Sequence, residues 1–181
     1  EATGRGIEEV IREFFRNKEE VKKAKLNENL KDNRIVIQGF GNVGRHLAYE
    51  LYNRDNAKII AIGEYNGILY NENGIDINKL IECVLFKKTI ENNELGKFIK
   101  NPKEIVEVEC DILVPAALEG VINKDNVEKV KTKLIVEAAN GPIDPASDKI
   151  LFNKGVTVLP DIYVNAGGVV VSYFEWVKNL S

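Results

Sequence analysis

The sequence contains no methionine, one histidine, one tryptophan and two cysteines. With Cys83 and Cys110 as the only thiols, a disulfide framework or a zinc site has little support, and we expect both thiols to be reduced and buried. A chain without methionine, even at its first position, is expected to be processed, truncated or a piece of a longer protein.

Long apolar runs and a strong charge of one sign are also lacking. No run approaches the roughly 18 residues of a membrane span, and the first residues have no signal-peptide core. We therefore expect a cytoplasmic location, with mitochondria as the alternative. The net charge of −3 gives no electrostatic reason to bind nucleic acid or a membrane surface. The 181 residues, 44% of them hydrophobic, are typical of one globular domain.

The most informative stretch is an apolar strand over residues 34–38 that runs into G-x-G-x-x-G, formed by Gly39, Gly41 and Gly44. In a dinucleotide site the first glycine permits a tight turn, the second lets backbone amides approach a pyrophosphate, and the third lets helix and strand pack closely. The helix that follows directs its free N–H groups and positive dipole end at the phosphates. The alternative is a glycine loop that serves helix packing alone.

A second apolar strand ends at Glu64, at the roughly 20-residue distance after the glycines that the dinucleotide fingerprint has. A carboxylate there accepts hydrogen bonds from the adenosine ribose and repels a 2′-phosphate. The motif therefore predicts NAD, with NADP possible where lysines or backbone amides compensate. The lone histidine, His46, lies one turn into the intervening helix, and we interpret it as structural rather than as a general base.

Strands and helices alternate along the rest of the chain. The expected elements are an amphipathic helix from Ile7, a charged tail over 17–31 that ends in a solvated loop, a small hairpin or an extended excursion at 68–70, a helix capped by Asp76, a strand from Cys110 that ends at Pro115, a short helix at 123–131, a strand at 132–138, a helix from Pro145 capped by Asp144, a strand at 156–159 and an apolar helix opened by 165–168. This alternation predicts an α/β fold: a Rossmann-like, doubly wound, mostly parallel sheet with helices on both faces. Right-handed crossovers would bring the loops after its strands to one edge.

The chain resembles the cofactor domain of the glutamate dehydrogenases, in the Glu/Leu/Phe/Val dehydrogenase family. The matching segments are Glu1–Gly6, Gly39–Gly44, Asp111–Ala117, Glu137–Pro142, Pro160–Val169 and Ser172–Trp176. The resemblance covers essentially the whole chain. It implies one dinucleotide-binding domain over residues 1–181, without the family's N-terminal catalytic domain, and therefore no catalytic residue and no metal site in this chain.

The resemblance also implies which residues meet the cofactor and the substrate. The implied cofactor residues are Gly39, Phe40, Gly41, Asn42, Val43 and Gly44 at the pyrophosphate, Glu64 at the adenosine ribose, Ala116, Ala117, Asn140 and Asn165 along the nicotinamide half, and Thr3 near the carboxamide. Val169 and Ser172 match positions that face the far end of the glutamate side chain. A hydroxyl there suits a carboxylate, whereas a small apolar residue would suit leucine.

Members of this family transfer a hydride from the α-carbon of L-glutamate to a nicotinamide cofactor, which leads to 2-oxoglutarate and ammonia. We expect a domain that binds NAD or NADP and turns over nothing alone, within a full-length protein that is a homo-oligomer, commonly a hexamer. Two alternatives stay open at this point: a stand-alone NAD(H)-sensing module, and the cofactor domain of a branched-chain amino-acid dehydrogenase.

Overall fold

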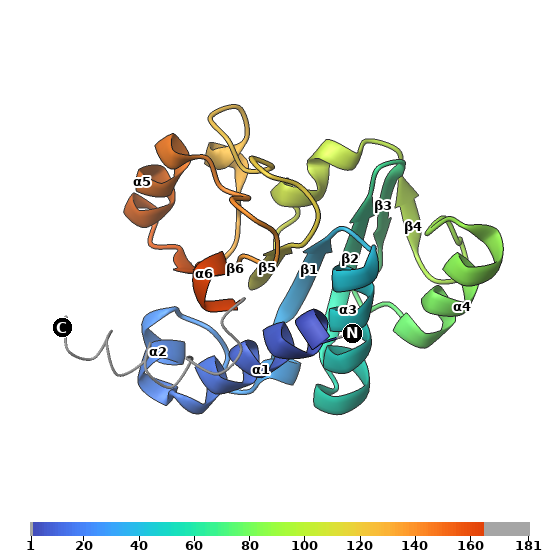
Figure 1. The fold of residues 1–181 in the computed structure, drawn as a ribbon, viewed down its shortest axis with the longest axis horizontal. Helices are drawn as coiled ribbons and strands as arrows, with labels where there is room; N and C mark the ends of the chain where they lie inside the picture. The colour runs from blue at the N-terminus through green and yellow to red at the C-terminus, as the bar shows by residue number, and fades with distance from the viewer. Residues whose placement is uncertain (1, 165–181) are drawn as a thin grey trace.

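The computed structural model describes residues 2–164, which form a seven-stranded sheet between two layers of helices (Figure 1). The sheet order is β4-β3-β2-β1-β5-β6-β7. In this order β2, β1, β5, β6 and β7 run parallel, whereas β3 and β4 are antiparallel to their neighbours. The strands are β1 (Arg34–Gln38), β2 (Lys58–Glu64), β3 (Gly67–Tyr70), β4 (Lys97–Ile99), β5 (Ile112–Pro115), β6 (Leu134–Val136) and β7 (Thr157–Leu159).

Alternate residues of the central strands divide the core between the two faces of the sheet. Ile35 and Ile37 of β1 belong to one apolar cluster, and Val36 between them belongs to the other. Because both faces are covered, the strand is buried throughout rather than alternately polar. The helices are α1 (Ala2–Arg16), α2 (Lys18–Lys23), α3 (Asn42–Asp55) and α4 (Ile77–Lys87) on the first face, α5 (Pro145–Asn153) on the second, and α6 (Asp161–Val164) after β7.

The sheet has its topological switch between β1 and β5. From β1 the chain crosses through α3 to β2 on one side, and the later strands β5, β6 and β7 extend the sheet on the other side. The connections on the two sides cover opposite faces, which confirms the predicted doubly wound fold. In such sheets the loops that follow the two central strands separate and leave a crevice at the carboxyl edge.

The predicted amphipathic helix is confirmed as α1, whose apolar residues are buried against α3 and the sheet. Between the two helices the side chain of Glu8 is also fully buried. Arg54 Nη1 lies 3.5 Å from Glu8 Oε2, and Arg12 Nε lies 3.3 Å from Asp55 Oδ1. Among the described residues, Glu8 Oε1 and Asp55 Oδ2 have no hydrogen-bond donor. Burial, followed by the neighbouring carboxyl group of Asp55, raises the pKa of Glu8 to about 7.

Two of the expected elements are wrong. The charged tail over 17–31 is not a solvated loop. Asn17 caps α2, and the apolar residues of the tail, Val21, Ala24 and Leu26, are buried. The short helix expected over 123–131 is reduced to a 3-10 turn, η3 (Val127–Lys129). Local hydrogen bonds explain the difference, since side chains in this stretch accept from nearby backbone N–H groups and so compete with a helix.

Several local predictions are confirmed. Asp76 caps α4, and Asp144 caps α5, which begins at Pro145. β3 pairs with β2 as the expected hairpin. Cys83 and Cys110 are buried and free. Four further elements had not been predicted: β4, α6 and the 3-10 helices η1 (Leu30–Asp32) and η2 (Pro102–Glu107).

Candidate functional site

The loops that follow β1 and β5 are fixed side by side at the carboxyl edge of the sheet. Gly39 N–H donates to the carbonyl oxygen of Gly63, and Ala116 N–H donates to that of Gln38, both at 2.7 Å. The Gln38 side chain also accepts from Ala117 N–H at 3.3 Å. The backbone pairing of the sheet thus continues past the strand ends and holds the first residues of both loops in place.

The three glycines of the motif occupy three different environments. Gly39 has a φ of +100°, and a methyl group there would lie 2.6 Å from Cβ of Ala117. A methyl group at Gly44 would overlap the carbonyl oxygen of Gly39. The predicted turn and close packing are therefore confirmed. By contrast, nothing lies within 4 Å of a Cβ at Gly41, so the backbone there faces open space.

Gly41 is also the N-cap residue of α3. It has no side chain to accept from the first turn of the helix, and the first hydrogen bond within the helix is from Arg45 N–H to Gly41 at 2.9 Å. The N–H groups before Arg45 remain available to an external acceptor. With the positive end of the helix dipole behind them, they form a suitable binding position for a phosphate.

Glu64, at the end of β2, reaches over to the glycine loop. Its Oε1 accepts from Phe40 N–H at 2.5 Å, and no bond to its Oε2 is formed within the described part of the chain. The side chain is half-buried. One oxygen of the carboxylate therefore positions the loop, and the other is available for a ligand hydroxyl.

A hollow of about 430 Å³ opens beside the glycine loop, on the side of β5 and β6. The residues that line it are Thr3, Val43, Ala116, Ala117, Glu119, Ala138, Ala139 and Asn140. Five of these were predicted at widely separated positions in the sequence, and the fold brings them together. Glu119, Ala138 and Ala139 had not been predicted as site residues, although each lies only a few residues after the end of β5 or β6.

A series of hydrogen bonds holds the far wall of this hollow. Glu137 Oε2 accepts from Asp161 N–H at 2.9 Å, and Asp161 Oδ2 accepts from Gly141 N–H at 3.0 Å. The carbonyl oxygen of Gly141 in turn accepts from Gly120 N–H at 2.9 Å. Asp161 is thus a hydrogen-bond anchor for the loop that contains Gly141. Burial is the main cause that raises the pKa of Glu137.

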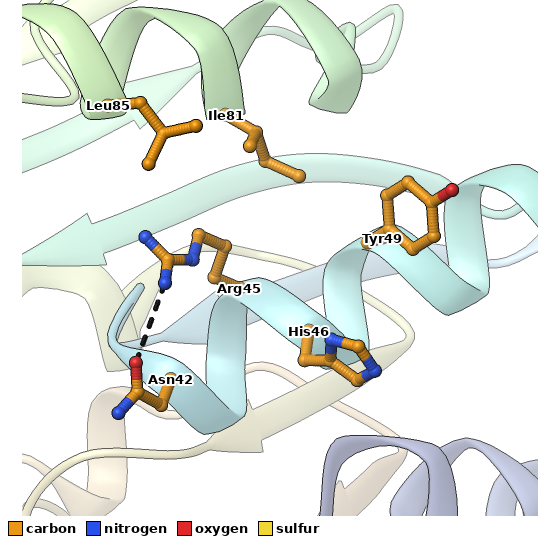
Figure 2. A pocket seen from close by; sticks show the side chains of 6 residues that line it. All are labelled: Asn42, Arg45, His46, Tyr49, Ile81 and Leu85. Atoms are coloured by element: carbon orange, nitrogen blue, oxygen red, sulfur yellow. Dashed lines mark hydrogen bonds between the residues drawn. The ribbon is translucent and has the colours of Figure 1, made fainter. Parts of the chain in front are cut away.

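One predicted side chain points elsewhere. Asn42 Oδ1 accepts from Arg45 Nη2 at 3.5 Å, in a second hollow of about 530 Å³ between α3 and α4 (Figure 2). The side chain of Asn42 is thus on the α4 side of the glycine loop, and only its backbone can face a ligand above Gly41. His46 lines this second hollow, and its Nε2 lies 3.7 Å from Glu50. Both features agree with a structural role for this histidine.

Asn165, Val169 and Ser172 lie outside the described residues. Within residues 2–164, no three His, Cys, Asp or Glu side chains gather into a possible metal site. None of the helices in that range is both long enough and apolar enough to cross a membrane.

Comparison with known proteins gives matches along the full length of the chain. Residues 1–181 match the family described as Glutamate/Leucine/Phenylalanine/Valine dehydrogenase. A mitochondrial glutamate dehydrogenase of Dictyostelium discoideum is 47% identical over 181 residues, which are 100% of this chain and 36% of that protein. An NADP-specific glutamate dehydrogenase of Saccharolobus shibatae is 43% identical over 180 residues, which are 99% of this chain and 40% of that protein.

Solved structures agree with these matches. The glutamate dehydrogenase of Peptoniphilus asaccharolyticus superposes with a TM-score of 0.70 at 38% identity, over 99% of this chain and 39% of the other. The hetero-hexameric glutamate dehydrogenase of Thermus thermophilus, in a leucine-bound form, gives 0.77 at 28% identity, over 99% and 40%. The chain spans about two fifths of the length of the proteins that it matches.

Proposed function

This chain belongs to the glutamate/leucine/phenylalanine/valine dehydrogenase family, and from that membership we propose that it is the dinucleotide-binding domain of a glutamate dehydrogenase. In the full protein, the reaction would move a hydride from the α-carbon of L-glutamate to the nicotinamide, with 2-oxoglutarate and ammonia as products. The groups that transfer protons would belong to a further domain. Residues 1–181 alone would bind the cofactor without turnover.

The observation that carries this proposal is the open backbone at Gly41, which lies between Glu64 and the alanine-lined hollow. A dinucleotide needs these three features in this order. The N–H groups of α3 would receive the pyrophosphate, and Oε2 of Glu64 would accept from the adenosine ribose. The nicotinamide half would lie along Ala116, Ala117 and Asn140, where small side chains allow close approach. Bound there, the nicotinamide ring supplies the hydride acceptor.

NAD is the cofactor that we propose, with NADP possible. The charge of Glu64 disfavours a 2′-phosphate, and its second oxygen is free to accept a ribose hydroxyl. A relative as similar as the Saccharolobus shibatae protein is named NADP-specific, and for that reason we keep NADP as the alternative. Local charge rather than overall fold would then decide the choice in this chain.

For the substrate we propose L-glutamate, in agreement with the names of the two relatives described above. Val169 and Ser172 would contact the far end of its side chain, with the Ser172 hydroxyl as a hydrogen-bond donor to the carboxylate. A branched-chain substrate would instead favour an apolar residue at that place. We extend the proposal to assembly as well: the full-length protein would be an oligomer, as the Thermus thermophilus protein is.

Calorimetric titration of the chain with NAD⁺, NADH and NADP⁺ tests the proposal. We expect saturable binding that prefers NAD⁺ and NADH, and a loss of this preference in Glu64→Ala. Gly41→Ala should weaken binding at least about tenfold, because a methyl group would enter the space of the phosphates. Its thermal unfolding should change little, since no atom lies within 4 Å of the added carbon. A folded chain that binds no dinucleotide at millimolar concentration would overturn the proposal.

A further inference from the structure

The carboxyl edge of the sheet presents several carboxylates, and three of them are committed to backbone N–H groups. Glu64 accepts from Phe40, Glu137 accepts from Asp161, and Asp161 accepts from Gly141. Each bond joins two segments that are distant in the sequence. These side chains therefore have a structural task, whatever else they bind.

Glu119 differs from them. Its side chain lines the hollow, and among residues 2–164 it forms neither a hydrogen bond nor an ion pair. It is exposed, and the walls around it are largely methyl groups of alanines. The Glu119 carboxylate therefore lies at the hollow without a hydrogen-bond donor from the described residues. Among the four carboxylates named here, it is thus the one that remains fully available to a ligand.

The backbone fixes the position of Glu119, although its side chain has no partner in the part of the chain that the structure describes. The next residue, Gly120, has a φ of +61° and donates its N–H to the carbonyl oxygen of Gly141 at 2.9 Å. Cγ of Glu119 lies 3.7 Å from where a Cβ of Gly141 would be. The turn therefore holds the carboxylate beside the loop that also contains Asn140, and Asp161 anchors that loop from behind.

We propose that Glu119 binds the ribose on the nicotinamide side of the dinucleotide, by accepting hydrogen bonds from its two vicinal hydroxyls. The inference rests on the proposed function and names a residue that it does not include. An ionised carboxylate has two acceptor oxygens and no donor, which matches a pair of O–H donors. It repels phosphates, and so it favours the part of the ligand beyond the pyrophosphate. The two riboses would then each meet one glutamate, Glu64 at one end and Glu119 at the other.

Two shorter ligands separate this contact from the rest of the site. ADP ends at the pyrophosphate, whereas ADP-ribose continues with the second ribose and lacks the nicotinamide. We expect the wild-type chain to bind ADP-ribose about tenfold more tightly than ADP, from one pair of charge-assisted hydrogen bonds. In Glu119→Ala the two affinities should become equal, with ADP unchanged. Glu119→Gln keeps one acceptor oxygen and should recover part of the difference.

Glu72→Ala is the matched control. Glu72 is an exposed glutamate in the turn after β3, near the amino end of β2, and its removal should leave both affinities unchanged. If ADP binds but the second ribose adds nothing, or if Glu119→Ala weakens both ligands equally, the role of Glu119 is wrong and the dinucleotide site stands. If ADP itself fails to bind the folded chain, the proposed function fails as well.

Discussion

The two halves of the carboxyl edge hold their shape by different means. In the first half, made by β1, α3 and β2, close packing is the main constraint on the glycine loop, because Gly44 lies directly against the carbonyl of Gly39, and the hydrogen bond from Phe40 N–H to Glu64 adds to it. In the second half, beyond β5 and β6, hydrogen bonds hold the loops: Glu137 accepts from Asp161 N–H, and the Asp161 carboxylate accepts from Gly141 N–H. There is space around Gly141, where the nearest atom to an added Cβ is 3.7 Å away.

The difference shows which changes each half tolerates. Packing at Gly39 and Gly44 excludes any added side chain and does not depend on ionisation. Hydrogen bonds to carboxylates admit a larger residue nearby but depend on the acceptors. The glycine loop receives the charged part of the proposed ligand and needs an unchanging backbone. We expect the loops of the second half to accommodate substitutions more readily than the glycine loop does.

Gly44→Ala should have the largest effect on stability, because it disrupts the close packing between the glycine loop and α3. The added methyl group would overlap a backbone oxygen, so β1 and α3 must move apart. We expect a loss of about 3 kcal/mol or more in the free energy of unfolding, measured by urea denaturation, together with loss of dinucleotide binding. Gly41→Ala is the control, with at most about 1 kcal/mol lost at this N-cap position. A Gly44→Ala chain as stable as the wild type would contradict the comparison.

A pH titration of stability should show the ionisation of Glu8, whose side chain is buried between α1 and α3. Glu8 has a pKa of about 7 in the folded chain against an ordinary value of 4.5. The folded state therefore holds a proton that the unfolded state has lost, and stability falls as pH rises. The contribution is fully present below about pH 4.5 and is lost as pH passes about 7, a fall of at most about 3 kcal/mol.

Glu8→Gln should remove most of this pH dependence, because the amide stays neutral at every pH. Glu9→Gln is its control, since Glu9 is on the exposed face of α1 beside Arg5. Denaturation curves at several pH values measure both variants. An equal slope in Glu8→Gln and wild type would show that Glu8 is already ionised in the folded chain.

Gly141→Ala tests the second half with the same kind of substitution as in the first. The residue has a φ of +51°, so alanine is strained there, but no atom blocks the methyl group. We expect a loss of about 1–2 kcal/mol from the backbone alone. A loss as large as that of Gly44→Ala would mean that both halves are fixed by packing.

Asp161→Ala should have the smallest effect on stability, about 0.5–1.5 kcal/mol for one hydrogen bond. The change should appear locally, as faster hydrogen exchange at the backbone N–H of Gly141. This N–H donates to Asp161 Oδ2 at 3.0 Å in the wild type. Asp161→Asn keeps an acceptor oxygen and should restore most of the protection. Exchange at Phe40 in the first half should stay unchanged in both variants.

The contrast also explains how much of the molecule the sequence predicts. The glycine spacing, the caps at Asp76 and Asp144, and the apolar strands are local patterns, and all appear as predicted. η2 is missed because only Ile105 and Val106 are buried in a polar segment. α2 is missed because most of its residues are charged, so the sequence shows too few apolar positions to reveal a helical pattern.

At the site, the first half is predictable and the second is predictable only in part. Glycines must recur at fixed spacing, whereas Glu137 and Asp161 are 24 residues apart and meet only in the fold. Nothing in the sequence marks the alanines of the hollow as site residues. They come together only because β5 and β6 are neighbours in the sheet. Glu119 stands out only in the fold, where the other three carboxylates accept from backbone N–H groups and Glu119 has no such donor within residues 2–164.

A crystal structure of the chain with NAD⁺ tests the central claim most directly. The account predicts a dinucleotide along the carboxyl edge, with its pyrophosphate at the N-terminus of α3 above Gly41. One ribose should lie within hydrogen-bond distance of Glu64 and the other within that of Glu119. A dinucleotide in the hollow between α3 and α4, beside Arg45 and Tyr49, would contradict the account.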